Sequence, residues 1–316
     1  MIYAGIDLGG TSIKGALVTD KGEILRKKSI PAGAERSHRE VVTDMANLIL
    51  DLMTEEGLTP EEVASVGVGS PGAIDPEKGE VIFAANFADF RNVPMRSIME
   101  EILEMPVYVD NDANVAALGE SMFGAGEGCR NCVALTLGTG LGGGVIIDGK
   151  IFSGAFYGGA ELGHQVIVVD GEPCTCGRKG CWEAYSSATA LIRMGKEAAL
   201  AHPDSQLGSL AGEGLAEMEA KTVFDAAQAG DEVAQGVIDV YIKYLAAGIV
   251  NTINVFQPEV LIVGGGVSAQ GEKLMEPLRE KVQQEVFGGQ ADKTQLRAAT
   301  LGNDAGVIGA AMLGIE

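Results

Sequence analysis

The chain has 316 residues, with 44 acidic and 23 basic side chains and a formal net charge of −21 at pH 7. Its length is typical of two domains, and 46% hydrophobic residues are too many for a disordered chain. With so few basic residues and only 5% aromatic residues, the chain lacks the side chains that hold phosphates and stack on bases, so no nucleic-acid partner is expected.

The sequence also indicates a soluble protein of the cytoplasm with no membrane partner. The N-terminus carries neither a basic region nor a cleavage pattern, and we find no apolar run of the roughly 20 residues that span a bilayer. Residues 131–147 come closest, but they include five glycines and several polar residues. In that compartment the five cysteines should stay reduced.

The first part of the chain alternates apolar runs, glycine-rich turns and amphipathic segments. In chain order the predicted elements are strands at 2–8 and 14–18, a helix at 38–56, strands at 63–68 and 107–109, and a helix at 113–123. Turn residues at 19–22 close the first two strands into a hairpin.

The opening pattern returns at residue 133. An apolar strand at 133–137 is followed by the turn Gly-Thr-Gly, a second strand through residue 147 and an Asp-Gly-Lys turn at 148–150. Two such hairpins at nearly equal spacing suggest an internal duplication of an α/β domain, with a cleft between the copies. The chain after residue 185 is mostly helical, with helices at 241–256 and 305–313 around a strand at 260–263, which again indicates α/β architecture.

Two glycine-rich turns are candidate phosphate sites. At residues 7–11 (Asp-Leu-Gly-Gly-Thr) the glycines let backbone N–H groups approach a polyphosphate, and Asp7 could hold a hydrated Mg²⁺. Residues 138–140 (Gly-Thr-Gly) offer the same chemistry from the second hairpin. An ordinary tight hairpin explains either turn equally well. Neither is a Walker loop, and neither is a dinucleotide fingerprint, because the turn leads into a strand.

Four potential metal ligands gather in one segment: His164, Cys174, Cys176 and Cys181. Three thiolates and one imidazole form a complete tetrahedral set for Zn²⁺, which leaves no open position and predicts a structural site. Free buried thiols and a disulfide are the alternatives, and both fit three closely spaced cysteines in a reducing compartment less well. A remaining Cys-x-x-Cys pair at 129–132 is interpreted as ordinary thiols.

Asp112 is the candidate general base. It follows a buried strand and begins a predicted helix, where active-site residues of α/β folds collect, and a carboxylate there could accept a proton. From position alone, a helix N-cap at Asp110 or Asp112 is the stronger explanation. Glu183, judged alone, is a solvated surface carboxylate.

These motifs resemble those of known families. Five segments are similar to the nucleotide-site motifs of the actin/hexokinase ATPase superfamily: residues 7–14, 107–120, 135–144, 261–268 and 302–310. Residues 161–164 (Glu-Leu-Gly-His), followed by the cysteine pattern that ends at Glu183, resemble the ROK family of sugar kinases and sugar-responsive repressors, as does Asn-Asp-Ala-Asn at 111–114.

The resemblance implies a fold of two ribonuclease-H-like α/β domains, as in actin-like ATPases, with a central cleft. It predicts an N-terminal domain at 1–115, with a C-terminal helix at 304–316 packed back on it. It also predicts a C-terminal domain at 116–303 with a zinc-binding insertion at 161–183.

The resemblance also implies the cofactors and the site. ATP with Mg²⁺ would be bound by Asp7, Gly9, Gly10, Thr11, Lys14, Gly138, Thr139, Gly140, Gly264, Gly265 and Gly266. The sugar would be bound by Gly72, Asn86, Asn111, Asp112, Glu161, His164 and Glu183, with Asp112 as the catalytic aspartate. His164 would have one ring nitrogen on the structural Zn²⁺ and the other toward the sugar.

The resemblance implies ATP-dependent phosphorylation of a hexose at its 6-hydroxyl, with glucose favoured. Kinases of N-acetylglucosamine, N-acetylmannosamine, fructose and allose share much of this motif set. A sugar-sensing regulatory protein is the other alternative, but the repressors carry a helix-turn-helix domain for which a first motif at Asp7 leaves no room. A homodimer or homotetramer is expected, as is frequent in the family.

The sequence departs from the family in one loop. Residues 86–90 read Asn-Phe-Ala-Asp-Phe where many ROK glucokinases carry Asn-x-x-Gly-Trp, so Asp89 replaces a glycine and Phe90 a tryptophan. This change leaves the shape of the loop, and therefore the identity of the sugar, open.

Overall fold

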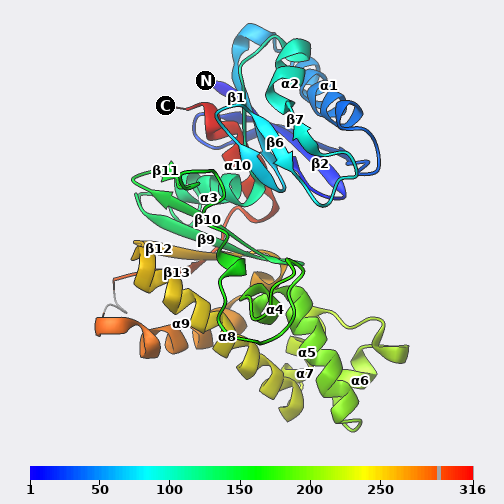
Figure 1. Cartoon of the computed structure of the whole chain (residues 1–316), viewed down its shortest axis with the longest axis vertical. Helices are drawn as coiled ribbons and strands as arrows, with labels where there is room; N and C mark the ends of the chain where they lie inside the picture. Colours follow the sequence, from blue (N-terminus) through cyan, green and yellow to red (C-terminus); the bar gives the residue numbers. More distant parts are fainter. Residues whose placement is uncertain (290–292, 316) are drawn as a thin grey trace. The chain divides into compact units, whose positions relative to one another are not determined.

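The computed structural model describes residues 1–289 and 293–315 (Figure 1). The chain divides into two compact units. Unit 1 comprises Met1–Ala134, Gly144–Ala160 and Thr300–Glu316, and unit 2 comprises Leu135–Gly143 and Glu161–Ala299. The domain boundaries expected from the sequence stay a prediction, and Glu316 of the predicted C-terminal helix lies outside the described residues.

Unit 1 is built on a five-stranded sheet of order β3-β2-β1-β4-β8. Its strands are β1 (Ile2–Leu8), β2 (Ser12–Thr19), β3 (Ile24–Pro31), β4 (Val63–Ser70) and β8 (Val107–Asn111). The first three form an antiparallel meander, and β4 and β8 add to β1 in parallel. The carboxyl ends of β1, β4 and β8 therefore meet at one edge of the sheet, where Asp7 and Asp112 were expected to act.

A second sheet has the order β11-β10-β9-β12-β13. Its strands are β9 (Cys132–Leu137), β10 (Leu141–Ile147), β11 (Lys150–Ile151), β12 (Val260–Gly264) and β13 (Gln295–Ala298). In both sheets the first strand of a hairpin lies in the centre, an antiparallel strand lies at one edge, and two later strands pair in parallel on the other side. This common order is what the predicted duplication requires.

A small antiparallel sheet, which the sequence pattern did not predict, follows β4 in the chain. It consists of β5 (Ala73–Asp75), β6 (Glu80–Phe83) and β7 (Arg91–Val93). The loop between β6 and β7 carries Asn86.

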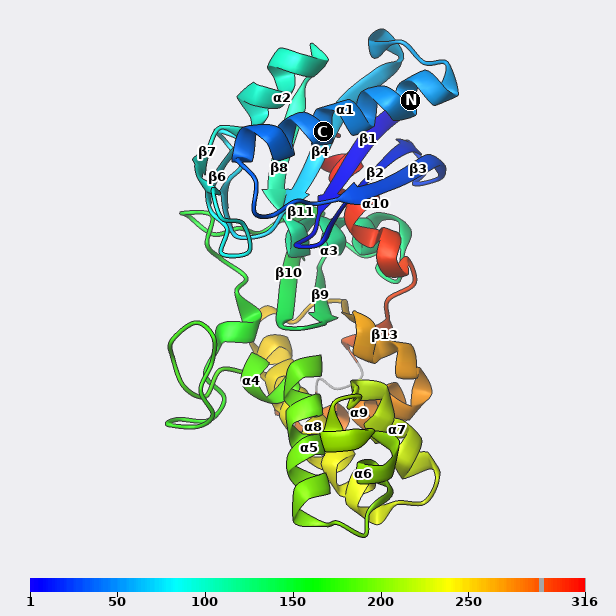
Figure 2. The same cartoon turned by 90° about the vertical axis from the view of Figure 1, so that its right-hand side faces the viewer.

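Helix α1 (His38–Glu56) packs along one face of the first sheet (Figure 2). Ser37 caps its N-terminus and forms a reciprocal capping box with Glu40, and Gly57 ends it in the left-handed conformation at φ 69°. Its apolar side chains recur at helical spacing, and the buried ones are Val41, Val42, Met45, Ala46, Leu48, Ile49, Leu52 and Met53. The predicted bounds of this helix are confirmed.

The opposite face of the same sheet is covered by α10 (Ala305–Ala311), which in turn packs on α3 (Asp112–Phe123). The approach is close because strand glycines face the helix. A Cβ built on Gly67 would lie 1.7 Å from the carbonyl oxygen of Ala310. The remaining helix of this unit, α2 (Met95–Leu103), packs against α1.

Unit 2 is mainly helical. Its helices are α4 (Glu183–Ser186), α5 (Ala188–Ala201), α6 (Gln206–Leu210), α7 (Ala220–Gln228), α8 (Glu232–Phe256) and α9 (Glu272–Glu285). Among the described residues of both units, short 3₁₀ turns lie at Pro60–Glu62, Leu162–His164, Glu213–Leu215, Gly266–Gln270, Phe287–Gly289, Gly302–Asp304 and Met312–Gly314.

By length and composition α8 could cross a membrane, which corrects the expectation that the chain has no apolar stretch of that length. However, half of the most apolar 18-residue stretch of this helix is buried inside the protein. The buried positions include Val237, Tyr241, Leu245 and Ile249, four residues apart, and the helix packs against α4, α5, α7 and α9. These are the features of a core helix.

Glu120, near the end of α3, is a buried carboxylate with only 3% of its surface exposed. It accepts hydrogen bonds from the backbone N–H groups of Ala125 at 2.9 Å, Thr300 at 3.0 Å and Leu301 at 2.8 Å. It therefore fastens the point at which the chain re-enters unit 1 at Thr300.

We expect Glu120→Gln to lower the free energy of unfolding by about 2–3 kcal/mol. The NH₂ group of glutamine would face the backbone N–H groups that now donate to the carboxylate, and two donors cannot form a hydrogen bond. Urea unfolding followed by circular dichroism measures this loss. Glu127→Gln removes the same charge from an exposed position of the adjacent turn and should leave stability nearly unchanged. Equal stability of the two variants would contradict a fastening role for Glu120.

Candidate functional site

The first predicted phosphate turn joins β1 to β2. Gly9 donates its backbone N–H to the carbonyl oxygen of Ser12 at 2.9 Å, and Gly10 and Thr11 are exposed. Asp7 and Lys14 lie opposite each other in the strand register, and their side chains form an ion pair of 3.1 Å. The turn therefore offers exposed backbone groups with a carboxylate and an ammonium group at its base.

The start of α3 holds the predicted base, Asp112. The helix cap is Asn111, whose side-chain oxygen accepts from the backbone N–H groups of Ala113 at 2.9 Å and Asn114 at 3.3 Å. The N-cap explanation for Asp110 or Asp112 is therefore wrong. Asp112 occupies the first helical position, is half-buried and accepts from the N–H of Ala113 at 2.9 Å.

The amide nitrogen of Asn111 donates to the carbonyl oxygen of Gly72 at 3.1 Å, so two predicted sugar-binding positions are joined directly. Gly72 has φ 96°, and a Cβ built on it would lie 2.1 Å from the carbonyl oxygen of Phe83. Only glycine fits this position, because both the backbone conformation and the neighbouring strand exclude a side chain.

Sequence reasoning gave Asp110 only a capping role, and the structure gives it another. It is buried, and one carboxylate oxygen accepts from the N–H of Asn111 at 2.6 Å and from the side-chain amide of Asn114 at 2.9 Å. Burial raises the pKa of the Asp110 carboxyl, and these two hydrogen bonds oppose that shift. Asp110 thus fixes the turn that presents Asp112. In the sequence, the only sign of this role is that Asp110 belongs to the run Asp-Asn-Asp at residues 110–112.

The second predicted phosphate turn, residues 138–140, joins β9 to β10. Its closing hydrogen bond runs from the N–H of Gly138 to the carbonyl oxygen of Gly140 at 3.0 Å. Glu183 supports the turn by accepting from the N–H of Leu141 at 3.0 Å. A Cβ at position 140 would lie 2.3 Å from the Glu183 carboxylate, so a side chain there would displace it.

The third glycine run follows β12 and lies against the end of β9. Gly265 has φ 84°, and a Cβ built on it would lie 2.5 Å from the backbone nitrogen of Leu137. Unit 2 therefore brings residues 264–266 next to the turn at 138–140.

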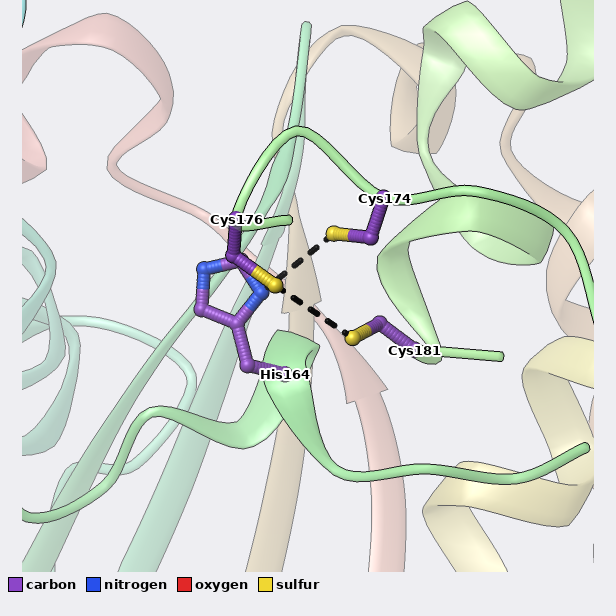
Figure 3. Close-up of side chains that lie close together, drawn as sticks. All are labelled: His164, Cys174, Cys176 and Cys181. Carbon is purple, nitrogen blue, oxygen red and sulfur yellow. Dashed lines mark hydrogen bonds between the residues drawn. The ribbon is translucent and has the colours of Figure 1, made fainter. Parts of the chain in front are cut away.

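The four predicted metal ligands converge in unit 2, as Figure 3 shows. The ligand atoms of His164, Cys174, Cys176 and Cys181 all lie within 4.8 Å of one another. The Cys174 sulfur is 3.6 Å from His164 Nδ1, and the Cys176 and Cys181 sulfurs are 3.7 Å apart. A tetrahedral Zn²⁺ would require edges of about 3.6 Å between sulfur and nitrogen and about 3.8 Å between two sulfurs. The donor set and these two distances therefore fit Zn²⁺.

The three thiols differ in environment. Burial raises the pKa of the Cys174 thiol, and burial together with the neighbouring thiols raises that of Cys181 to about 12. A backbone N–H donated by Arg178 lowers the pKa of the exposed Cys176 thiol. The raised pKa values mean that thiolates at Cys174 and Cys181 are disfavoured without a cation, and a bound metal ion would supply the positive charge that stabilises them.

The cluster of His164 and the three cysteines is attached to the core of unit 2 by the residue that follows its last cysteine. The ring of Trp182 is fully buried, its Nε1–H donates to the carbonyl oxygen of Tyr244 at 3.1 Å, and it packs so closely on α8 that Gly248 has no room for a Cβ. On the other side, Glu183 accepts from the hydroxyl of Thr175 at 3.3 Å. Glu183 therefore connects the cluster to the glycine turn at residues 138–140.

Glu161 is exposed and precedes the short 3₁₀ turn Leu162–His164, where its carbonyl oxygen accepts from the N–H of His164 at 3.1 Å. The imidazole of His164 presents Nδ1 to the sulfurs. Its Nε2 therefore faces away from the cluster, as a second role toward a ligand would require.

Asn86 lies beside the first glycine turn, since a Cβ built on Gly10 would be 3.9 Å from both Cβ and Nδ2 of Asn86. The predicted site residues thus form two groups. The group in unit 1 contains Asp7, Gly9, Gly10, Thr11, Lys14, Gly72, Asn86, Asn111 and Asp112. The group in unit 2 contains Gly138, Thr139, Gly140, Glu161, His164, Cys174, Cys176, Cys181, Glu183, Gly264, Gly265 and Gly266.

The chain is similar to known proteins along almost its whole length. The family model described as "ROK family" matches residues 3–316. A glucokinase of Thermotoga maritima is 41% identical over 309 residues, covering 98% of this chain and 96% of its own. A glucokinase of Halalkalibacterium halodurans is 39% identical over 312 residues, covering 98% of this chain and 94% of its own.

A solved structure shares the fold as well as the sequence. The ROK family glucokinase from Streptomyces griseus, crystallised with glucose and AMPPNP, is 37% identical and superimposes with a TM-score of 0.82 over 99% of both chains. The family model matches almost the whole chain, and the fold is shared with a solved member of the family. The protein is therefore a member of the ROK family.

Proposed function

We propose that this protein is an ATP-dependent glucokinase that transfers the γ-phosphoryl group of ATP to the 6-hydroxyl of glucose. The observation that carries the proposal is the presentation of Asp112 at the start of α3, in a chain that aligns end to end with relatives named glucokinase. Asn111 caps the helix, and the carboxylate of Asp112 at the first helical position would accept the proton of the attacking hydroxyl.

The two glycine turns would bind the phosphates of ATP through backbone N–H groups. These donors are fixed before the reaction, so they stabilise charge on the transferring group without reorganisation. Mg²⁺, when bound, would neutralise charge on the phosphates of ATP, and Asp7 at the base of the first turn is the carboxylate that would hold it. Residues 264–266 would lie against the adenosine.

Recognition of the sugar would use side-chain amide, carboxylate and imidazole groups that hydrogen-bond its hydroxyl groups. In unit 1 these are Asn86 and Asn111, and the carbonyl oxygen of Gly72 holds the Asn111 amide by accepting a hydrogen bond from it. In unit 2 they are Glu161, His164 and Glu183. A structural Zn²⁺ held by His164 and the three cysteines would fix the ring tautomer and orientation of His164.

A coupled assay of ADP release tests the proposal. Glucose, N-acetylglucosamine, N-acetylmannosamine, fructose and allose should be compared with ATP as donor, and the product identified with glucose-6-phosphate dehydrogenase. Glucose should give the highest kcat/KM. A tenfold preference for another hexose would reject glucose as the substrate, and glucose binding without turnover of any sugar would favour a sensor.

Two further expectations belong to this proposal. The protein would act in the cytoplasm, without a nucleic-acid or membrane partner, and would assemble as a homodimer or homotetramer. Light scattering coupled to size-exclusion chromatography tests the assembly, and a mass near 32.7 kDa in solution would reject it.

A further inference from the structure

The loop between β6 and β7 carries Asn86 and departs from the family pattern. Its base is closed by a hydrogen bond from the N–H of Ala84 to the carbonyl oxygen of Phe90 at 3.1 Å. Phe87 and Phe90 are both buried, and their ring centroids are 4.4 Å apart. The inner side of the loop is therefore anchored in the core of unit 1, with Phe90 as part of the anchor.

The outer side of the loop is held by a polar connection to α1. One carboxylate oxygen of Asp89 accepts from the backbone N–H of His38 at 3.0 Å and from its ring Nδ1 at 2.8 Å. Beside it, the N–H of Ala88 donates to the carbonyl oxygen of Ala34 at 2.9 Å. The side chain of Asp89 is 54% exposed, so its hydrogen bonds to His38 form at the surface of the protein.

His38 is the first residue of α1, and its N–H has no carbonyl partner inside the helix. A carboxylate at this end of a helix also interacts favourably with the helix dipole. The backbone N–H and the ring of His38 hold the pKa of the Asp89 carboxyl below its usual value. Neighbouring charges are engaged elsewhere: Arg39 pairs with Glu101, and Glu40 binds Ser37.

We propose that Asp89 and His38 form a tether that positions Asn86 for the sugar. The tether fixes residues 86–90 at the outer side while the two phenylalanines fix the inner side, so Asn86 stays beside Gly10. Both are positioning residues, since neither would touch the sugar. The inference rests on the proposed function, because the ligand it serves is the hexose.

Asp89→Ala removes the acceptor of both hydrogen bonds. Deuterium exchange of the backbone amides in residues 84–90 should become faster, and the KM for glucose should rise about fivefold, the size of a lost helix-terminal hydrogen bond. The kcat and the KM for ATP should stay within about twofold, because the phosphate turns and Asp112 are untouched. Asp89→Asn keeps an acceptor oxygen and should restore most of the wild-type values.

Glu101→Gln is the matched control. It removes an exposed ion pair made by the next residue of α1, Arg39, and should change neither the exchange nor the KM for glucose. Unchanged exchange and unchanged KM in Asp89→Ala would overturn the tether, as would equal losses in the KM for glucose, the KM for ATP and kcat. If the wild type phosphorylates no hexose, the proposed function fails. The tether is then tested only by whether the amides of residues 84–90 exchange faster in Asp89→Ala than in the wild type.

Discussion

An Asp112→Asn variant should bind glucose nearly as well as the wild type and turn it over about a thousandfold more slowly. Asparagine keeps the size of the side chain and can still hydrogen-bond the 6-hydroxyl, but it cannot accept the proton. The helix should be unaffected because Asn111 is its cap. The coupled assay gives kcat, and isothermal titration calorimetry gives the Kd for glucose.

Asp110 provides the internal comparison, since it lies two residues away and its carboxylate is buried. Asp110→Asn should act mainly on folding, seen as a lower Tm, because it weakens hydrogen bonds to Asn111 and Asn114. A near-normal kcat in Asp112→Asn would contradict the assignment of the base. A thousandfold loss in Asp110→Asn at unchanged Tm would move the assignment to that residue.

A Cys176→Ser variant should lose its bound zinc and at least tenfold in kcat/KM for glucose. A serine hydroxyl is a poor ligand for Zn²⁺, and three remaining ligands leave an incomplete site. Without the ion, His164 loses its fixed orientation, and Glu183 loses the ordered segment that contacts it through Thr175. Mass spectrometry of the metal content should find one zinc per wild-type chain and almost none in the variant.

Cys129→Ser is the control for this experiment, because it removes a thiol that stands apart from the cluster of His164 and the three cysteines. It should keep both the zinc and the activity. Wild-type protein that carries no zinc after expression in zinc-containing medium would contradict the metal site. A Cys176→Ser variant with full sugar affinity would show that the site does not support sugar binding.

Much of the fold could be predicted because its signals are local. Helix α1 has apolar residues at helical spacing between a capping serine and a left-handed glycine, and both ends came out as expected. Helix α8 did not: the apolar spacing suggested a start at Tyr241, but it begins at Glu232, where Asp231 caps it by accepting from Val233 and Ala234. The cap outweighs the more polar first turns.

By itself, the sequence determined the duplicated hairpins, the glycine turns and the four candidate metal ligands, because the signal for each of these lies within a short span of chain. The tertiary structure alone decided that Asn111, and neither of the aspartates beside it, caps α3. It also decided that the backbone of Thr300 donates to the buried Glu120, and that Asp89 accepts from His38, 51 residues away. Periodicity and turn chemistry act between near neighbours, whereas these partners are chosen by the path of the whole chain, which no local pattern records.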